Sequence, residues 1–511
     1  MKVAFIQSES ESIGIEYLSS VLKEAGHATR LYFEPSLFSD SHVVFGRQWK
    51  FFDFTGHLIE QVVHDAPDLL CFSVVTDSVR WALDVAARIR KQRNAFTIFG
   101  GIHASSVPER MIRKDMVDAV CMGEGEEPLV ELADRLEREK PYHDIAGLCV
   151  EYEGKIYSNP VRPLNQDLDA VPFPDKRLYY DPYPCYQHVY TIVASRGCPN
   201  NCSYCNNNVT RKLYRGKGKY LRRRSVENVM EELKYAKRTW DLKAVDFHDD
   251  IFTTDREWIR DFCAQYKKEI NLPFKCIAHV QYMDEEMLAL LEDAGCKNMQ
   301  VGVETYDENI RKTILNRHMS NEQLDKALMP IQKTGIGLIA DHMLALPHEG
   351  EASQVASARF YNRIKPKTIY GAWLTCYPNS NITEYCLEQG IISREDLEAM
   401  AEGNPKSMMT VGGDLHGYKE LLPFQFILGY IPLLPRWLIT FLLNKRRYRF
   451  LPGSPFIAIV LPRFIKSFFW QDIRARLNLR RYRFFLPLAL RLRFGKSKRS
   501  SPAPESVESK A

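Results

Sequence analysis

Cysteine is scarce in this chain. Twelve cysteines in 511 residues are too few for a disulfide-stapled scaffold, and the opening residues MKVAFIQSES lack the charged and then apolar segments of a secretory leader. With 45% hydrophobic and 26% charged residues, the composition excludes a disordered chain and a fibre. We therefore expect a cytoplasmic protein, and the length suggests roughly two to four domains.

Acidic residues are nearly absent from the C-terminal region. Between Lys445 and Arg499, sixteen Lys and Arg residues stand against one acid, Asp472, whereas residues 1–444 carry a net charge of −9. A basic tail on an acidic body suits a polyanionic partner, either an anionic membrane or a nucleic acid. The acidic body itself is poorly suited to bind nucleic acid.

Short apolar runs alternate with amphipathic helical patterns in residues 1–140. Continuous apolar strands separated by helices predict a parallel sheet covered on both faces. We expect a doubly wound, flavodoxin-like domain that binds its ligand at the carboxyl ends of the strands. The predicted strands are Lys2–Gln7, Thr29–Glu34, Asp68–Val75, Phe96–Gly101 and Asp118–Gly123.

The strand and helix alternation stops at residues 141–187 and resumes after them. A small hairpin is predicted at 151–156, and six prolines then argue for an irregular linker. Residues 188–400 contain six further strand–helix units, which predict an incomplete parallel barrel with its chemistry on the loops after the strands. The strands are expected at 190–196, 244–249, 274–280, 297–304, 335–344 and 368–377.

The C-terminal extension, residues 401–495, is basic, apolar and predicted to be helical. Residues 421–443 are long enough to cross a bilayer, but three prolines and Arg436 argue against a simple span. Shorter apolar runs follow at 456–461 and 464–470. Residues 496–511 have the composition of a disordered tail.

Three cysteines stand at C-x3-C-x2-C spacing directly after the first strand of the second domain. Cys198, Cys202 and Cys205 lie in the sequence SRGCPNNCSYC, and such a loop brings thiolates together as soft metals and iron–sulfur clusters require. Three cysteine ligands leave one iron of a cubane open to an exogenous ligand. The alternative is a zinc site completed by Cys185 or His188.

This cysteine motif on a partial barrel resembles the radical S-adenosylmethionine superfamily. The resemblance implies that Cys198, Cys202 and Cys205 hold a 4Fe–4S cluster, whose open iron takes S-adenosylmethionine. Tyr204 would lie near the adenine. Reductive cleavage of S-adenosylmethionine would yield methionine and a 5′-deoxyadenosyl radical, with electrons from a flavodoxin or ferredoxin type donor.

Other residues match places where that superfamily contacts its cofactor. The sequence FHDD ends the second strand and implies that Asp249 and Asp250 contact the methionine group, although the usual Gly-Gly-Glu is absent. Glu304 would face the ribose or the substrate, in a catalytic or cofactor-binding role. The sequence LPHE at 346–349 has His348 where glycine is usual. For the three acids, helix capping after a strand is the structural alternative.

The first domain resembles the cobalamin-binding domain of cobalamin-dependent members of the superfamily. Three of its strands are followed by glycine or hydroxyl residues, which would let a flat cofactor or its nucleotide tail approach the backbone. The alternative is that these are turn glycines and caps of any flavodoxin-like fold. The Asp-x-His-x-x-Gly motif that ligates cobalt elsewhere is missing, and His103 would be a tail contact or structural. The implied cobalamin-binding residues are Ser73, Thr76, Gly100, Gly101, His103, Gly123 and Gly125.

The extension and the body together suggest a function. The basic, aromatic-rich extension suits the anionic inner surface of a membrane, a nucleic acid, or a helical cap over the barrel. The resemblance implies a methyltransferase acting on an unactivated carbon, or a radical cyclase, with a small hydrophobic, lipid or isoprenoid substrate. An RNA-modifying methylthiotransferase is disfavoured because residues 1–140 hold only Cys71 and Cys121. A cobalamin- or redox-sensing membrane module is the non-enzymatic alternative.

Overall fold

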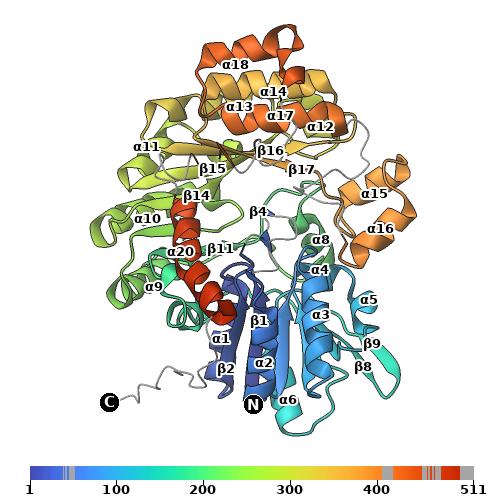
Figure 1. The fold of residues 1–511 in the computed structure, drawn as a ribbon. Helices are drawn as coiled ribbons and strands as arrows, with labels where there is room; N and C mark the ends of the chain where they lie inside the picture. Colours follow the sequence, from blue (N-terminus) through green and yellow to red (C-terminus); the bar gives the residue numbers. More distant parts are fainter. Residues whose placement is uncertain are drawn as a thin grey trace.

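Two α/β units are stacked in the computed structural model, with the first unit at the bottom of Figure 1 and the second above it. The structure describes residues 1–37, 52–404, 418–451, 457, 461–462, 465 and 473–494, together with the backbone of 39–40 and 43–44. The fold is α/β throughout, as the alternation of apolar strands and amphipathic helices predicts.

The first unit contains a seven-stranded sheet. Its strands are β1 (Lys2–Ser8), β2 (Ala28–Glu34), β5 (Leu69–Ser73), β6 (Phe96–Gly100), β7 (Ala119–Cys121), β8 (Leu148–Tyr152) and β9 (Lys155–Ser158). They follow the order β2-β1-β5-β6-β7-β8-β9. The first five are parallel in flavodoxin-like order, which confirms the predicted sheet. The hairpin β8–β9 adds two antiparallel strands at the β7 edge.

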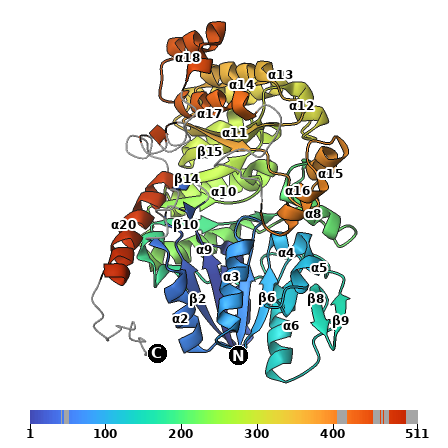
Figure 2. The same ribbon diagram turned by 45° about the vertical axis from the view of Figure 1, so that its right-hand side comes forward.

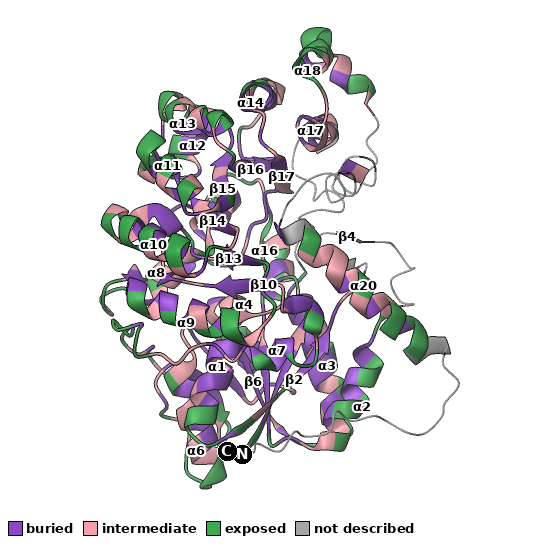
Figure 3. Cartoon of the chain, turned by 90° about the vertical axis from the view of Figure 1, so that its left-hand side faces the viewer, coloured by how far each residue is buried: buried purple, intermediate pink, exposed green. Residues whose placement is uncertain are grey.

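Helices cover both faces of the first sheet. The apolar side chains of α1 (Ile13–Glu24) and α6 (Glu126–Glu137) pack on one face. The other face is covered by α2 (Thr55–Asp65), α3 (Val79–Arg90), α4 (Ile102–Ser106) and α5 (Pro108–Ile112). The strands between them are buried, as Figure 3 shows in purple. Two residues each form the antiparallel strands β3 (Ser39–Asp40) and β4 (Val43–Val44).

The proline-rich segment after the hairpin is packed between the two units. It contains α7 (Arg177–Tyr180) and a 3-10 turn, η2 (Pro184–Tyr186). Tyr179, Tyr180 and Tyr186 are completely or almost completely buried. The prolines restrict regular secondary structure in this segment. Its tyrosine side chains are nevertheless buried, so the segment is held in place by hydrophobic packing.

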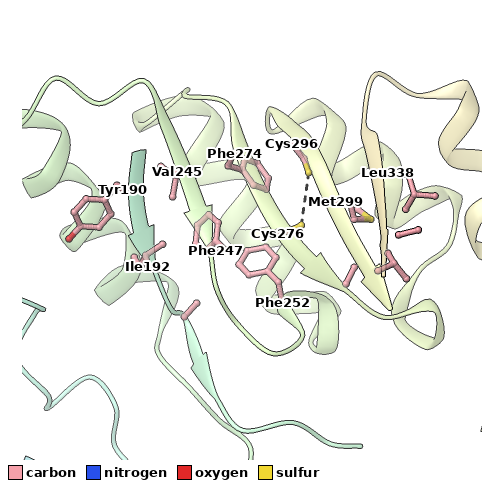
Figure 4. Packing of buried hydrophobic residues seen from close by; sticks show 14 of the residues in the cluster. Tyr190, Ile192, Val245, Phe247, Phe252, Phe274, Cys276, Cys296, Met299 and Leu338 are labelled. Carbon is pink, nitrogen blue, oxygen red and sulfur yellow. Dashed lines mark hydrogen bonds between the residues drawn. The ribbon is translucent and has the colours of Figure 1, made fainter. Parts of the chain in front are cut away.

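The second unit has a six-stranded, all-parallel sheet in the order β10-β13-β14-β15-β16-β17. This matches the predicted incomplete barrel. Figure 4 shows how its outward-facing side chains, such as Phe247, Phe274 and Met299, interdigitate under the helices. The strands are β10 (Val189–Ile192), β13 (Ala244–Phe247), β14 (Phe274–Ala278), β15 (Cys296–Glu304), β16 (Gly337–Leu344) and β17 (Thr368–Trp373).

The helices of the second unit follow the predicted amphipathic patterns closely. Ser225, Asp255, Asp284, Asp307 and Ser320 begin helices by accepting a backbone N–H with their side chains. These helices are α9 (Val226–Thr239), α10 (Arg256–Glu269), α11 (Glu285–Asp293), α12 (Glu308–Thr313) and α13 (Asn321–Leu328); α14 (Glu351–Ile364) follows β16.

The chain then returns to the first unit before it reaches the C-terminal extension. Helices α15 (Asn381–Glu388) and α16 (Arg394–Ala401) lie beside α4 and α5 in Figures 1 and 2. The Asn379 amide donates to the Ser106 carbonyl, and Lys114 pairs with Glu402 at 2.5 Å. The 141–187 segment and this return therefore both connect the two units.

The C-terminal extension folds against the rest of the protein. Residues 421–443 form the end of α17 (Tyr418–Tyr430) and then α18 (Arg436–Leu443), rather than one long helix. The turn η6 (Asn444–Phe450) follows, and α20 (Ile473–Phe494) packs its Phe485 against Phe33. Within the described residues, every helix is too short or too polar to cross a membrane. The predicted disordered tail and almost all of the runs at 456–461 and 464–470 lie outside the described residues.

Candidate functional site

A tight turn carries the three cysteines from the second sheet to a helix. After β10 and the short β11 (Ser195–Arg196), the chain passes Gly197 and reaches α8 (Asn206–Leu213). Gly197 has φ +87°, and a Cβ atom there would collide with the Tyr220 carbonyl. Cys205 occupies the residue before α8, at the positive end of the helix. The turn therefore presents thiols at the carboxyl end of the sheet.

The Cys198 thiol interacts electrostatically with Asp250 and with the Cys202 and Cys205 thiols, although the three Sγ atoms do not all lie within 4.8 Å of one another. Burial raises the pKa of the Cys198 thiol to about 12, and the Asp250 carboxylate and the other two thiols add to this shift. Burial also raises the pKa of Cys202 and Cys205. The Asn207 amide donates to Cys205 Sγ at 3.7 Å. With these raised pKa values the thiols are protonated at neutral pH, and a bound metal would favour their thiolates.

Arg317 is the cation nearest to Cys202. Its guanidinium donates to Cys202 Sγ at 3.6 Å, to the Tyr204 hydroxyl at 3.2 Å and to the Gly302 carbonyl at 2.7 Å. The Tyr204 hydroxyl in turn donates to Glu304 Oε1 at 2.9 Å. One network therefore joins three segments: the cysteine turn with Cys202 and Tyr204, the end of β15 with Glu304, and the loop that carries Arg317.

Glu304 is held in a strained backbone conformation at the end of β15. Its φ is +65°, a region that non-glycine residues rarely occupy, and the pairing of β15 with β16 shifts between Gly302 and Glu304. A Cβ atom at Gly302 would collide with the Glu304 carboxylate and come within 3.3 Å of Arg317. Such strain is concentrated at functional sites. Gly302 thus makes room for the Glu304 and Arg317 side chains.

The two aspartates after β13 differ in their surroundings. Asp249 is fully buried; it accepts the Ala194 N–H at 3.1 Å and the Ser195 hydroxyl. It therefore anchors the strand that leads into the cysteine turn. Asp250 is exposed and lies next to the Cys198 and Cys205 thiols. Of the two, Asp250 is placed to meet a ligand at the cysteines.

The loop after β16 also has unusual backbone geometry. Ala345 and His348 both have positive φ, at +61° and +62°. The His348 imidazole contacts the Tyr385 hydroxyl at 2.8 Å, and Glu349 accepts the Leu346 N–H at 3.2 Å. His348 adopts a backbone conformation that favours glycine. This agrees with the sequence comparison, in which the superfamily that the motif resembles usually has glycine at this place.

The residues proposed to complete a zinc site lie elsewhere. His188 precedes β10, whereas the cysteine turn follows it, so the two are at opposite ends of the strand. The His188 ring contacts the Asp241 carbonyl at 2.9 Å. Cys185 is buried in η2, and burial raises the pKa of its thiol to about 12. Neither side chain can join Cys198, Cys202 and Cys205 around one ion.

A cavity of about 380 Å³ lies between the first sheet and the second unit. Apolar side chains such as Phe5, Leu18 and Ile98 line it, and Val193 and Arg196 close it from the second unit. The Arg196 guanidinium lies over the Tyr17 ring at 5.0 Å and pairs with Glu126 at 2.7 Å. Five of the predicted cobalamin-binding residues line this cavity, namely Ser73, Gly100, Gly101, Gly123 and Gly125.

Thr76 and His103 lie outside the lining of this cavity. The Thr76 hydroxyl contacts His103 Nδ1 at 3.0 Å, and both side chains are buried. Burial lowers the pKa of His103 to about 4, so the imidazole is neutral at physiological pH. This pair stabilises the packing of α4 on the loop after β5.

Two of the glycines near the cavity are required by contacts within the protein, whether or not a ligand binds. A Cβ atom at Gly101 would lie 2.6 Å from the Val74 carbonyl oxygen, and one at Gly123 would collide with the Tyr214 hydroxyl. Tyr214 follows α8, and its hydroxyl accepts the Glu124 N–H at 2.6 Å. The GEGE sequence therefore also docks the first unit onto the second.

Sequence reasoning missed Arg317, Arg196 and Tyr214. Arg196 stands two residues before Cys198, and this position beside the cysteine motif could have identified it as a candidate site residue. Arg317 lies in a loop between two helices, where no periodicity or spacing distinguishes it from a solvated arginine.

Comparison with known proteins agrees with both units. Residues 3–133 match the family model of the B12 binding domain, and residues 192–360 match that of the radical SAM superfamily. An uncharacterized methyltransferase of Pyrococcus horikoshii is 28% identical over 332 residues, covering 64% of this chain and 71% of that protein. The hopanoid C-3 methylase of Methylococcus capsulatus is 28% identical over 329 residues, which are 59% of this chain and 55% of that protein.

A solved structure shares the fold over nearly the whole chain. The cobalamin-dependent S-adenosylmethionine radical enzyme OxsB, with aqua-cobalamin and S-adenosylmethionine bound, superimposes with a TM-score of 0.64 at 16% identity. The match covers 96% of this chain and 84% of that chain. By the two family-model matches, residues 192–360 form a radical SAM domain and residues 3–133 a B12-binding domain, and the protein is a radical SAM enzyme with an N-terminal B12-binding domain.

Proposed function

We propose that this protein is a cobalamin-dependent radical S-adenosylmethionine methyltransferase that methylates an unactivated carbon of a small hydrophobic substrate. The observation that carries the proposal is the cavity between the two units. It is lined by Gly100, Gly101 and Gly123 of the B12-binding domain and by Val193 and Arg196 of the radical SAM domain. Arg196 stands two residues before Cys198, so both cofactor sites share one strand end.

The residues around the cysteine turn fit a 4Fe–4S cluster with S-adenosylmethionine. Cys198, Cys202 and Cys205 supply three soft ligands, and the cation of Arg317 next to Cys202 favours the thiolate. When bound, the cluster and S-adenosylmethionine supply a 5′-deoxyadenosyl radical. The protein binds and orients these groups. In this role Arg317 and Glu304 offer a donor and an acceptor to the charged ends of S-adenosylmethionine.

The cavity of the first unit fits the apolar and flat parts of cobalamin. Its lining is mostly apolar, and its glycines expose backbone rather than side chains to a ligand. Ser73 adds a hydroxyl at the edge. We expect no lower cobalt ligand from His103, because its Nδ1 contacts Thr76 and the ring is buried.

The overall reaction that we propose consumes two molecules of S-adenosylmethionine. A substrate C–H bond is replaced by C–CH3, while S-adenosylhomocysteine, methionine and 5′-deoxyadenosine are released. Two electrons per turnover come from an external donor of the flavodoxin or ferredoxin type. The similarity to a hopanoid methylase and the apolar C-terminal extension support a lipid or isoprenoid substrate.

Two measurements on anaerobically purified protein test this proposal. About four iron atoms and one cobalt atom per chain are expected, the stoichiometry of one cubane and one corrinoid. Reduction should then release 5′-deoxyadenosine, and a hydrophobic substrate should gain a methyl group from methyl-labelled S-adenosylmethionine. Iron without cobalt, or zinc alone, would contradict the cofactor assignment.

The product distinguishes the remaining enzyme types. Radical cyclisation would consume S-adenosylmethionine without transferring its methyl group, and methylthiotransfer would add sulfur to RNA. Methylthiotransfer is disfavoured, because residues 1–140 contain only two cysteines, Cys71 and Cys121, and both are buried in strands. Cofactor binding without S-adenosylmethionine cleavage would indicate a sensor.

A further inference from the structure

Helix α18 and the turn η6 carry exposed aromatic side chains at the end of the molecule far from the first unit. Trp437 is 69% exposed, Phe441 is 49% exposed and Phe450 is 89% exposed. These three residues, together with Lys445 and Arg447, are here named the aromatic–basic surface. Figures 1 and 2 both show α18 projecting at the top of the protein.

The aromatic side chains occupy one side of an amphipathic helix. Trp437 and Phe441 are four residues apart and so lie on the same face of α18. Ile439 and Leu443 point to the protein and are buried. Together with Phe450 of η6, these side chains expose an apolar surface of the kind that marks an interaction site.

The base of this surface is firmly attached to the barrel. The Lys365 ammonium donates to the Ile431 and Leu434 carbonyls at 2.6 and 2.5 Å, which caps the turn between α17 and α18. Glu351 accepts from the Tyr448 hydroxyl at 2.5 Å and the Arg449 guanidinium at 2.8 Å. The exposed aromatic residues therefore project from a rigid support.

Basic residues surround the aromatic ones. Residues 436–451 contain five Lys and Arg residues and no acid. The Arg447 guanidinium stacks on Phe441 at 4.0 Å, and Lys445 is exposed. The acid in contact with this segment, Glu351, is already paired with Arg449 and Arg446. Of the two cations of the surface, Arg447 therefore lies directly against an aromatic ring of the same surface.

We propose that the aromatic–basic surface docks this protein onto an anionic membrane. Aromatic side chains insert at the boundary between headgroups and acyl chains, and Lys and Arg bind anionic headgroups beside them. A dimer contact through this surface is disfavoured, because Lys445 and Arg447 of one copy would face the same two cations of the other. The inference does not depend on the proposed reaction, although it places the enzyme where a lipid substrate would be found.

The test is co-sedimentation of the full chain with lipid vesicles. Vesicles of phosphatidylcholine with phosphatidylglycerol should bind the protein, and vesicles of phosphatidylcholine alone should bind it about tenfold less strongly. The double variant Trp437→Ser/Phe441→Ser should lose binding by about tenfold or more. Lys445→Glu/Arg447→Glu should weaken binding to the anionic vesicles only.

Matched variants separate this surface from other exposed apolar residues. Tyr235→Ser, on α9 and 41% exposed, should leave binding unchanged, as should Leu488→Ser/Leu490→Ser on α20. Iron content and circular dichroism of each variant confirm that it is folded.

Three outcomes would overturn the proposal. They are equal binding to both vesicle types, loss of binding in the α20 variant but not in the α18 variant, and absence of vesicle binding. Light scattering tests the competing partner, a second copy of this chain: a dimer that Trp437→Ser/Phe441→Ser converts to a monomer would also overturn it. Because none of these measurements requires turnover, their failure is distinguishable from failure of the proposed function.

Discussion

At the scale of single residues, Arg317 joins groups that the sequence shows far apart. It contacts Cys202 Sγ, the Tyr204 hydroxyl and the Gly302 carbonyl. Buried Arg311 supports the loop that carries it, by donating to the Thr305 and Met319 carbonyls. The cation is thus positioned by the protein before any cofactor binds, which is the condition for effective electrostatic stabilisation.

We predict that Arg317→Met keeps the cluster but lowers its reduction potential. Loss of a cationic hydrogen-bond donor to a cysteine ligand leaves the reduced, more negative cluster less stabilised. The rate of S-adenosylmethionine cleavage should fall by about 10- to 100-fold. Redox titration followed by electron paramagnetic resonance measures the potential, and Lys312→Met, at an exposed residue of α12, is the control. An unchanged potential would show that Arg317 does not act on the cluster.

Removal of a cluster ligand should have a stronger effect. Cys202→Ala is expected to abolish iron binding in the second unit and reductive cleavage of S-adenosylmethionine, because two thiolates cannot hold a cubane securely. Cys263→Ala removes an equally buried thiol from α10 and should retain both properties. Iron analysis and release of 5′-deoxyadenosine are the measurements. Retained cleavage in Cys202→Ala would contradict the cluster assignment.

Glu349 should make stability depend on pH. Burial raises its pKa to about 7, above the value of 4.5 expected in the unfolded chain. The stabilisation associated with the protonated carboxyl is therefore complete below pH 4.5 and is lost as the pH rises through 7. It amounts to roughly 3 kcal/mol at most. Glu349→Gln should thus gain stability relative to the natural protein between pH 5 and pH 8 in denaturant titrations, and a constant difference would refute this.

At the scale of secondary-structure elements, the sequence predicts the strands and helices of both sheets well. Strong apolar runs such as those of β1 and β5 are buried on both faces, so their pattern is unambiguous. The same reasoning failed where tertiary contacts decide the outcome. Tyr179 and Tyr186 give structure to a proline-rich segment through tertiary burial, which no local pattern predicts. At 421–443 the local signal is sufficient: the prolines argue against one simple span, and the turn at Pro432 and Pro435 divides the stretch into two helices.

Glycines in the loops after the strands differ from other glycines in how strongly the structure requires them. We predict that Gly101→Ala destabilises the protein by about 2–4 kcal/mol, because φ is +90° and the new Cβ would meet the Val74 carbonyl oxygen at 2.6 Å. Gly56→Ala, on α2 with no atom within 4 Å, should instead stabilise by about 0.5–1 kcal/mol. Denaturant titration measures both. Equal stability of the two variants would mean that the loop relaxes freely.

At the scale of the whole molecule, a buried charged cluster joins the two units. Lys176, between the units, pairs with Glu11 at 2.7 Å and Glu16 at 2.6 Å, and its side chain is fully buried. Thr191 of β10 donates to Glu11 at 3.1 Å. The pKa of Lys176 is raised by the two carboxylates against the effect of burial, so it stays charged. The Lys176 ammonium group thus links the first unit, the 141–187 segment and, through Glu11, strand β10 of the second unit.

Lys176→Met should therefore destabilise the entire protein by about 3–5 kcal/mol, since it leaves buried carboxylates unpaired. We expect Lys176→Met/Glu16→Leu to recover part of the loss, because it removes one of the carboxylates. Calorimetry of the natural protein should show a single transition for both units. Two separate transitions, or a double variant less stable than Lys176→Met, would argue against a shared cluster.

The position of Arg196 bears on where the proposed methylation would take place. Only Gly197 separates it from Cys198, and a residue spans at most about 3.6 Å, while its guanidinium closes the cavity of the first unit. A substrate held between the two sites would not have to migrate between losing hydrogen and gaining a methyl group. Both events would then occur on one carbon atom, and deuterium placed there should appear in 5′-deoxyadenosine from the same turnover that yields the methylated product.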